Sequence, residues 1–211
     1  MMFKTSGAKK QASVRMALLT GTALVGFTFA LPAQAQQTWE GGTSTDWFDP
    51  ANWTTAVPAA TDDVFIATTD APNMPVIDGA DAVAERVYLG DGGAPTGTLT
   101  IQNGGTLSNG FAAIGADAGF DYSVLVTGAG SDWTNSEDLY VGGSGTGALE
   151  ISDGGAVSNE FGFIGFSAGS TGTVSVTGAG SQWTNGNTLL VGGEGTGSLT
   201  ISDGGTVSNT I

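Results

Sequence analysis

The side chains that could do chemistry in this chain are chiefly carboxylates and tryptophans, because its 211 residues include no cysteine and no histidine. Two acidic pairs, Asp62-Asp63 and Glu137-Asp138, come nearest to the two carboxyl groups that a glycosidase places about 5–10 Å apart. Neighbouring residues of a strand point to opposite faces, so neither pair would flank one sugar. A lyase would also need basic side chains, and Arg86 is the only one after residue 35. We therefore expect no catalytic residues and no cofactor.

Turn aspartates are the candidate metal ligands, since Asp153 and Asp203 each precede a pair of glycines. The segment 142–150 is the nearest match to a calcium-roll motif, but Gly147 stands where that motif has its defining aspartate. An aspartate in a turn also bonds to its own backbone without any ion. We expect that structural role, and hence no metal site.

Three tryptophans, Trp39, Trp47 and Trp53, fall close together near the start of the chain. A parallel β-helix needs its first turn covered, because open strand edges promote aggregation. We therefore interpret residues 36–86 as a cap with one or two irregular turns, in which "DDVFI" and "MPVID" would be strands. Stacking of the exposed tryptophans on sugar rings is the alternative.

The remaining chain repeats one short phrase five times at a step of 25 residues, starting at positions 99, 124, 149, 174 and 199. A fixed period of this kind is typical of a solenoid. Each repeat holds three short apolar segments separated by glycine-rich turns, and the middle segment alternates, as in Leu149-Glu150-Ile151, like a half-buried strand. The sequence thus predicts an all-β, right-handed parallel β-helix with about 25 residues per turn and five turns in residues 87–211.

An asparagine closes the third segment of every repeat. These residues are Asn109, Asn135, Asn159, Asn185 and Asn209. Stacked amides stabilise coiled β-structures without a ligand, so we expect a structural ladder here. The residue two positions before the asparagine is aliphatic in odd repeats and is Trp133 or Trp183 in even ones, which creates a 50-residue super-repeat.

Residues 1–35 have the pattern of a secretory signal peptide. Four basic residues occur in the first 15 positions, residues 16–31 are uncharged and largely apolar, and "PAQAQ" follows. This order predicts cleavage after Ala35. The apolar stretch is shorter than the roughly 20 residues that span a bilayer as a helix.

The remainder of the chain is strongly acidic. From Gln36 onward there are 20 acidic residues and one basic residue, a net charge of −19. Such a surface repels polyanions, so nucleic acid is excluded as a partner. It is also typical of an exported protein that stays apart from its own copies.

Two phrases, "TWEGGTSTDWFDPANW" and "GSQWTNGNTLLVGGEGTGSLTISDGGTVSN", resemble the leading segment and the repeats of bacterial autotransporter passengers of type V secretion. This repeat family is shared with surface proteins that carry the PEP-CTERM sorting signal, and the resemblance covers residues 37–211. It implies export by the general secretory machinery of a Gram-negative bacterium, and a place at the cell surface, in the outer membrane or outside the cell. It also implies an outer-membrane β-barrel in the full-length protein. No alternating strands of about ten residues follow the repeats, so we expect a chain truncated after its fifth turn.

Two functions follow as expectations. The first is a non-enzymatic, surface-displayed stalk or adhesin-like passenger, in which outward residues such as Glu150 and Thr200 act collectively, for instance on a host-cell surface. The second is a glycan-binding module of an exopolysaccharide-associated surface protein. In that function Trp39, Trp47 and Trp53 would contact surface glycans.

Overall fold

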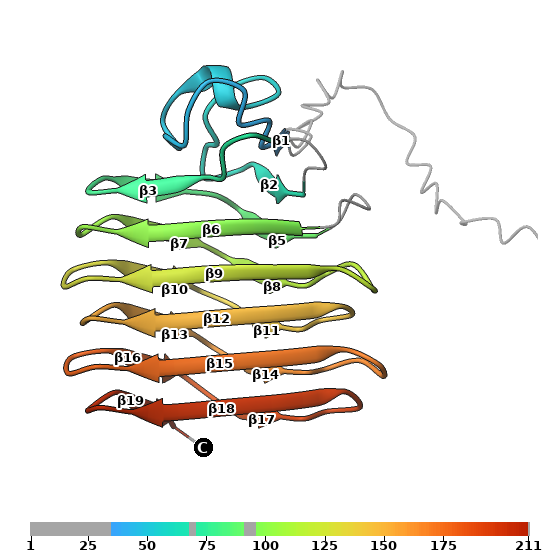
Figure 1. Cartoon of the computed structure of the whole chain (residues 1–211), viewed down its shortest axis with the longest axis vertical. Coiled ribbons are helices and arrows are strands. Elements are labelled where there is room, and N and C mark those ends of the chain that lie inside the picture. Colours follow the sequence, from blue (N-terminus) through green and yellow to red (C-terminus); the bar gives the residue numbers. More distant parts are fainter. Residues whose placement is uncertain (1–34, 68–70, 91–95, 211) are drawn as a thin grey trace, which may run out of the picture. The chain divides into compact units, whose positions relative to one another are not determined.

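The computed structural model describes residues 35–67, 71–90 and 96–210, so the predicted signal peptide lies outside the described residues. The chain is all-β, with 52% of it in strands and 2% in helix. Parallel sheets form a β-solenoid of about seven turns, with about 25 residues per turn (Figure 1). The fold class predicted from the sequence is confirmed.

Three sheets run along the solenoid, and each turn from β2 onward contributes one strand to each, while β1 adds a seventh strand to sheet 1. Sheet 1 consists of β1 (Gln36–Thr38), β2 (Asp63–Ile66), β5 (Arg86–Leu89), β8 (Phe111–Ile114), β11 (Leu139–Val141), β14 (Gly162–Ile164) and β17 (Leu189–Val191). Sheet 2 consists of β3 (Val76–Asp78), β6 (Thr96–Gln102), β9 (Asp121–Thr127), β12 (Thr146–Ser152), β15 (Thr171–Thr177) and β18 (Thr196–Ser202). Sheet 3 consists of β4 (Asp81–Val83), β7 (Thr106–Asn109), β10 (Asp132–Asn135), β13 (Ala156–Asn159), β16 (Gln182–Asn185) and β19 (Thr206–Asn209).

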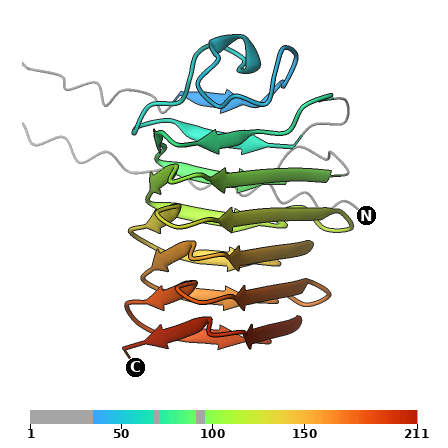
Figure 2. The same cartoon turned by 60° about the vertical axis from the view of Figure 1, so that its left-hand side comes forward.

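The coil is right-handed. In Figure 1 the strands of sheet 2 lie in front and run to the left, and the chain returns behind them to start the next turn one layer lower. Figure 2 shows the turns lying one beneath another, which brings residues about 25 positions apart in sequence into register.

The core is built from the inward positions of each turn. In β12 the side chains of Leu149 and Ile151 are buried and that of Glu150 is exposed, as the alternating pattern predicts. Leu149 pairs with Val124 on one side and Val174 on the other, so each inward position stacks on its equivalents. Burying such a side chain is worth about 1.5–3 kcal/mol, and every added turn repeats the gain.

Glycines in the turns allow the layers to approach closely. Gly142 has a φ of +73°, and a Cβ atom there would collide with the backbone of Thr171 in the next turn. Only glycine satisfies both the left-handed backbone and the contact. This explains why an aliphatic residue followed by glycine closes the first segment of each repeat.

The segment before the repeats covers the first turn. Strands β2 and β3 coincide with the predicted "DDVFI" and "MPVID". Upstream of them, β1 pairs with β2, and the short 3₁₀ helix η1 (Pro50–Asn52) belongs to a loop that returns to form an antiparallel bridge between Trp39 and Trp53. At the other end Ile201, the equivalent of the fully buried Ile151, is 49% exposed because β18 is the last strand of its sheet.

Candidate functional site

The three N-terminal tryptophans are interior residues. Trp39 and Trp47 have no exposed surface and Trp53 is 3% exposed. The Trp53 ring lies edge-on to both others, with centroids 5.0 Å from Trp39 and 4.7 Å from Trp47. Its indole N–H donates to the Trp47 carbonyl at 2.7 Å, and that of Trp39 donates to the Asn73 carbonyl at 2.7 Å.

The prediction that these tryptophans stack on glycans is therefore wrong, because none of them presents a ring face to solvent. The loop that holds them is organised by Asn52, whose buried side chain accepts from the backbone N–H groups of Thr43 and Ser44 and donates to the Asp46 carbonyl. A buried amide with all these partners fixes the loop over the rings. The cap interpretation accounts for the cluster.

The predicted asparagines stack in register along sheet 3, but they bond in pairs. The Asn109 amide donates to Asn135 at 2.7 Å, and that of Asn159 donates to Asn185 at 2.7 Å. Asn135 donates instead to the carbonyl of Ser158, at 3.4 Å. Asn209 stacks on Asn185 in the last pairing of the sheet.

The buried tryptophans of the even turns complete each pair. The Trp133 indole N–H donates to the Asn109 side-chain oxygen at 2.8 Å, and Trp183 donates to Asn159 at 2.6 Å. Each asparagine pair thus satisfies a buried indole that would otherwise lack a partner. We call each set of one tryptophan and two asparagines a Trp–Asn–Asn unit. These bonds give the asparagines structural partners.

The turn aspartates also have structural partners. Asp153 and Asp203 have φ angles of +53° and +50°, the left-handed conformation that aspartate and asparagine tolerate better than most residues. Each accepts a hydrogen bond from a threonine of the preceding turn, Thr127 and Thr177 respectively. Among the described residues no group of three or more acidic, histidine or cysteine side chains could hold a metal ion.

The two carboxylate pairs are not brought into one site. Asp62 accepts from the side chain of Gln37 and from the backbone of Ala59, while Asp63 lies 3.9 Å from Arg86. Burial raises the pKa of Asp63 despite that cation. Both therefore serve the contact between the first turns.

The second pair, Glu137 and Asp138, lies just before β11. Burial raises the pKa of Asp138, and the nearby charges of Glu137 and Glu160 add to the effect. Asp138, the residue before β11, is half-buried, whereas Glu137 is exposed.

A row of aromatic side chains on the outer face of sheet 1 is the candidate binding site. We call it the ring column, and it consists of Phe65, Tyr88, Phe111, Tyr140 and Phe163, one each from β2, β5, β8, β11 and β14. Successive ring centroids lie 5.3, 5.7, 5.6 and 4.5 Å apart along the column. All five side chains are half-buried, so the column keeps part of its ring surface open to solvent.

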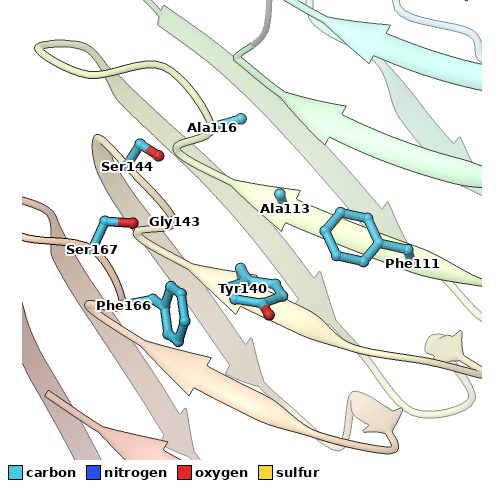
Figure 3. A pocket seen from close by; sticks show the side chains of 8 residues that line it. All are labelled: Phe111, Ala113, Ala116, Tyr140, Gly143, Ser144, Phe166 and Ser167. Atoms are coloured by element: carbon cyan, nitrogen blue, oxygen red, sulfur yellow. The ribbon is translucent and has the colours of Figure 1, made fainter. Parts of the chain in front are cut away.

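The column borders a shallow cavity of about 290 Å³ beside Ala113 that is largely open to solvent (Figure 3). Ala113 stands in the register that Tyr88, Tyr140 and Phe163 occupy in the turns around it, so the small side chain leaves a hollow there. The lining residues come from three successive turns. They are Phe111, Ala113, Ala116, Tyr140, Gly143, Ser144, Phe166 and Ser167.

Phe166 forms a wall of this cavity and lies 40% exposed in the loop after β14. Its ring stands nearly perpendicular to that of Tyr140, with an interplanar angle of 86° and a centroid distance of 5.2 Å. Figure 3 shows the Phe166 and Tyr140 rings side by side, with the Ser144 and Ser167 hydroxyl groups on the loops at the same end. None of the lining side chains carries a formal charge.

Sequence reasoning did not identify the ring column. For four of its five rings the signal is the residue immediately before the inward aliphatic residue of the first segment, as in Tyr88-Leu89-Gly90, Tyr140-Val141-Gly142 and Phe163-Ile164-Gly165. An outward aromatic at that position, repeated at the period of the solenoid, predicts a surface row.

Comparisons with protein-family models, with curated proteins and with solved structures gave no match for this chain. Across residues 35–67, 71–90 and 96–210, no helix has the length and apolar character needed to cross a membrane.

Proposed function

We propose that this chain is a non-enzymatic, surface-displayed stalk of the autotransporter-passenger kind, exported by the general secretory machinery. The observation that carries the proposal is that the inward positions of sheet 2 stay aliphatic from turn to turn while its outward positions change. In sheet 2 the inward Leu149 stacks between Val124 and Val174, whereas the outward Glu150 pairs with Leu125. The array thus keeps its core and varies its surface.

This division suits a scaffold. Each turn adds the same core and the same rise, so the number of turns sets how far the array reaches, and the outward residues set what it contacts. The charge of −19 after residue 35 keeps copies of the chain apart at a crowded surface. The resemblance to autotransporter passengers, together with the secretory pattern of residues 1–35, supports export and display. A host-cell surface or a surface glycan is the proposed contact.

Export is tested by expressing the full chain with a C-terminal epitope in a Gram-negative host and measuring the mass of the product after cell fractionation. We expect a product that begins at Gln36 and lies outside the cytoplasm. Leu24→Arg places a charge in the apolar segment and should hold the chain inside, whereas Thr22→Ser, two residues away, should not. An uncleaved product that stays in the cytoplasm would contradict the proposal.

The collective surface role is tested by coating beads with the exported product and measuring their retention on Gram-negative cells. We expect Glu150→Ala and Thr200→Ala each to reduce retention by less than about twofold, and the combined variant to reduce it further, because exposed contacts are individually weak. Complete loss of retention in either single variant would show one discrete site and overturn the collective mechanism.

A further inference from the structure

The ring column and its cavity have the composition of a site for a neutral sugar. We propose that sheet 1 binds a neutral glycan, with one sugar ring seated in the cavity between Tyr140 and Phe166 and further sugars along the column. This proposal rests on the stalk function and narrows its proposed contact with a surface glycan to one face of the solenoid and one class of sugar. It also moves glycan recognition away from the N-terminal tryptophans, which are buried.

Aromatic faces supply the apolar half of this recognition. A pyranose has one face of C–H groups, which pack on the negative face of an aromatic ring, and a rim of hydroxyl groups. Tyr140 and Phe166 meet at 86° and make a corner rather than a flat surface. A sugar ring that enters this corner can stack on one aromatic ring and place its edge against the other. The cavity of about 290 Å³ is at the small end of the range for small-molecule sites, which fits a single sugar unit.

Polar groups at the two ends of the corner supply the other half. The hydroxyl-bearing Ser144 and Ser167 line the cavity on the loop side. On the strand side Asp138 lies two residues before Tyr140 and thus on the same face of the sheet. Burial raises the pKa of the Tyr140 hydroxyl, and the charge of Asp138 adds to that rise. Carboxylates and serine hydroxyls accept hydrogen bonds from sugar hydroxyl groups.

Charge selects the class of glycan. The cavity is lined without formal charge, the carboxylate beside it is anionic, and the chain after residue 35 carries −19. Uronic acid polymers, sulfated glycans and nucleic acids would all be repelled. Tyr140 and Phe166 border the cavity on two sides, fewer than the cage of rings that holds a quaternary ammonium ion, and the remaining rings continue in a row. A neutral sugar is the class that all these features fit.

The column also fits a polymer rather than a single sugar. Phe65 and Tyr88 continue the row from Phe111 across two turns beyond the cavity, so a chain lying along the solenoid axis meets one ring in each of these turns. The cavity would hold one unit and set the register of the others. Affinity should then increase with the length of the oligosaccharide.

The test is titration calorimetry of the full chain with three neutral hexasaccharides: cellohexaose, laminarihexaose and maltohexaose. We expect at least one to bind with a Kd below about 10 mM, and its disaccharide to bind at least about tenfold more weakly. Phe166→Ala should weaken binding at least about tenfold, while Phe166→Tyr retains the wall and the affinity. Phe48→Ala is the matched control, since Phe48 is a half-buried phenylalanine of the N-terminal segment that does not line the cavity.

Three outcomes would overturn the proposal. They are a lack of binding by all three hexasaccharides, equal weakening by Phe166→Ala and Phe48→Ala, and tighter binding of tetramethylammonium or of a galacturonic acid hexamer than of the neutral sugars. A urea unfolding curve for each variant shows that a loss of binding is not a loss of fold. Export of the chain is unaffected by any of these results, so the stalk function is judged separately.

Discussion

Two groups of aromatic side chains in this protein differ in their exposure to solvent. Trp39, Trp47 and Trp53 are neighbours in sequence and are packed inside the cap, whereas the rings of the ring column come from strands roughly one turn apart and lie side by side on the outside. The comparison teaches that in a solenoid the period, and not local crowding, decides which residues form a surface. Aromatics that are close in sequence can close over one another, while those spaced by one turn must line up along a face.

The largest expected loss of stability comes from a substitution in the buried tryptophan cluster. Trp53→Ala removes the ring that packs against both other tryptophans and leaves the Trp47 carbonyl without its donor. We expect a loss of about 3–5 kcal/mol in the free energy of unfolding, measured by urea denaturation. Hydrogen exchange should locate the loss in residues 36–66. A cost below about 1 kcal/mol would mean that the cluster is not a core.

A smaller loss is expected in the Trp–Asn–Asn units, where polar bonding replaces ring packing. Asn109→Ala leaves the buried Trp133 N–H without its acceptor, so stability should fall by about 2–3 kcal/mol in the same denaturation assay. Asn159→Ala, the equivalent in the next unit, should cost the same amount. In the double variant with Trp133→Phe no indole N–H is left unpaired, so strictly additive costs would contradict this explanation.

The exposed group should tolerate what the buried group does not. Phe163→Ala removes a ring stacked on Tyr140 at 4.5 Å, but the side chain is only half-buried. We expect a cost of about 1 kcal/mol, well under the loss from Trp53→Ala. Thermal unfolding of the two variants side by side measures the contrast. Equal shifts in Tm would remove the distinction between core and surface aromatics.

The smallest expected effect concerns the charge beside the ring column, and it has the opposite sign. Burial, with Glu137 and Glu160, raises the pKa of Asp138 above its ordinary value of 3.8, so its ionised form is disfavoured in the fold. Stability from this group is present at low pH and is lost as the pH rises through the raised pKa. Asp138→Asn should therefore stabilise the fold at pH 7 by about 0.5 kcal/mol, or roughly 1–2 °C in Tm, and by nothing at pH 3. A pH-independent gain would point to packing instead of charge.

Much of the fold could be predicted from the sequence because the same pattern of inward and outward residues recurs in five repeats. The inward Leu149 and Ile151 are buried and Glu150 is exposed, as alternation requires. The asparagines lie in register as the period predicts, yet their bonding in pairs depends on whether a tryptophan is present in the neighbouring turn. That partner becomes visible only when two turns are placed side by side.

The candidate site was less accessible to sequence reasoning. The three tryptophans of the cap are close together in sequence, which is the pattern expected of a glycan-stacking cluster. Nothing in that local pattern shows that the loop around Asn52 closes over them. The cavity depends on Ala113, whose small size matters only because its registered neighbours are Tyr88 and Tyr140. A surface built from different turns cannot be read from any one of them.

The Trp–Asn–Asn units have a consequence for how such a protein changes length. Each unit ties an odd turn to the even turn after it, and the link onward is a single longer bond, such as that from Asn135 to the Ser158 carbonyl at 3.4 Å. Gene duplication or deletion of 50 residues leaves every indole with its acceptor. A change of 25 residues would place two tryptophan-containing turns, or two turns with an aliphatic residue at that position, in succession. Insertions or deletions of an even number of turns therefore conserve both the Trp–Asn–Asn units and the alternation of the core.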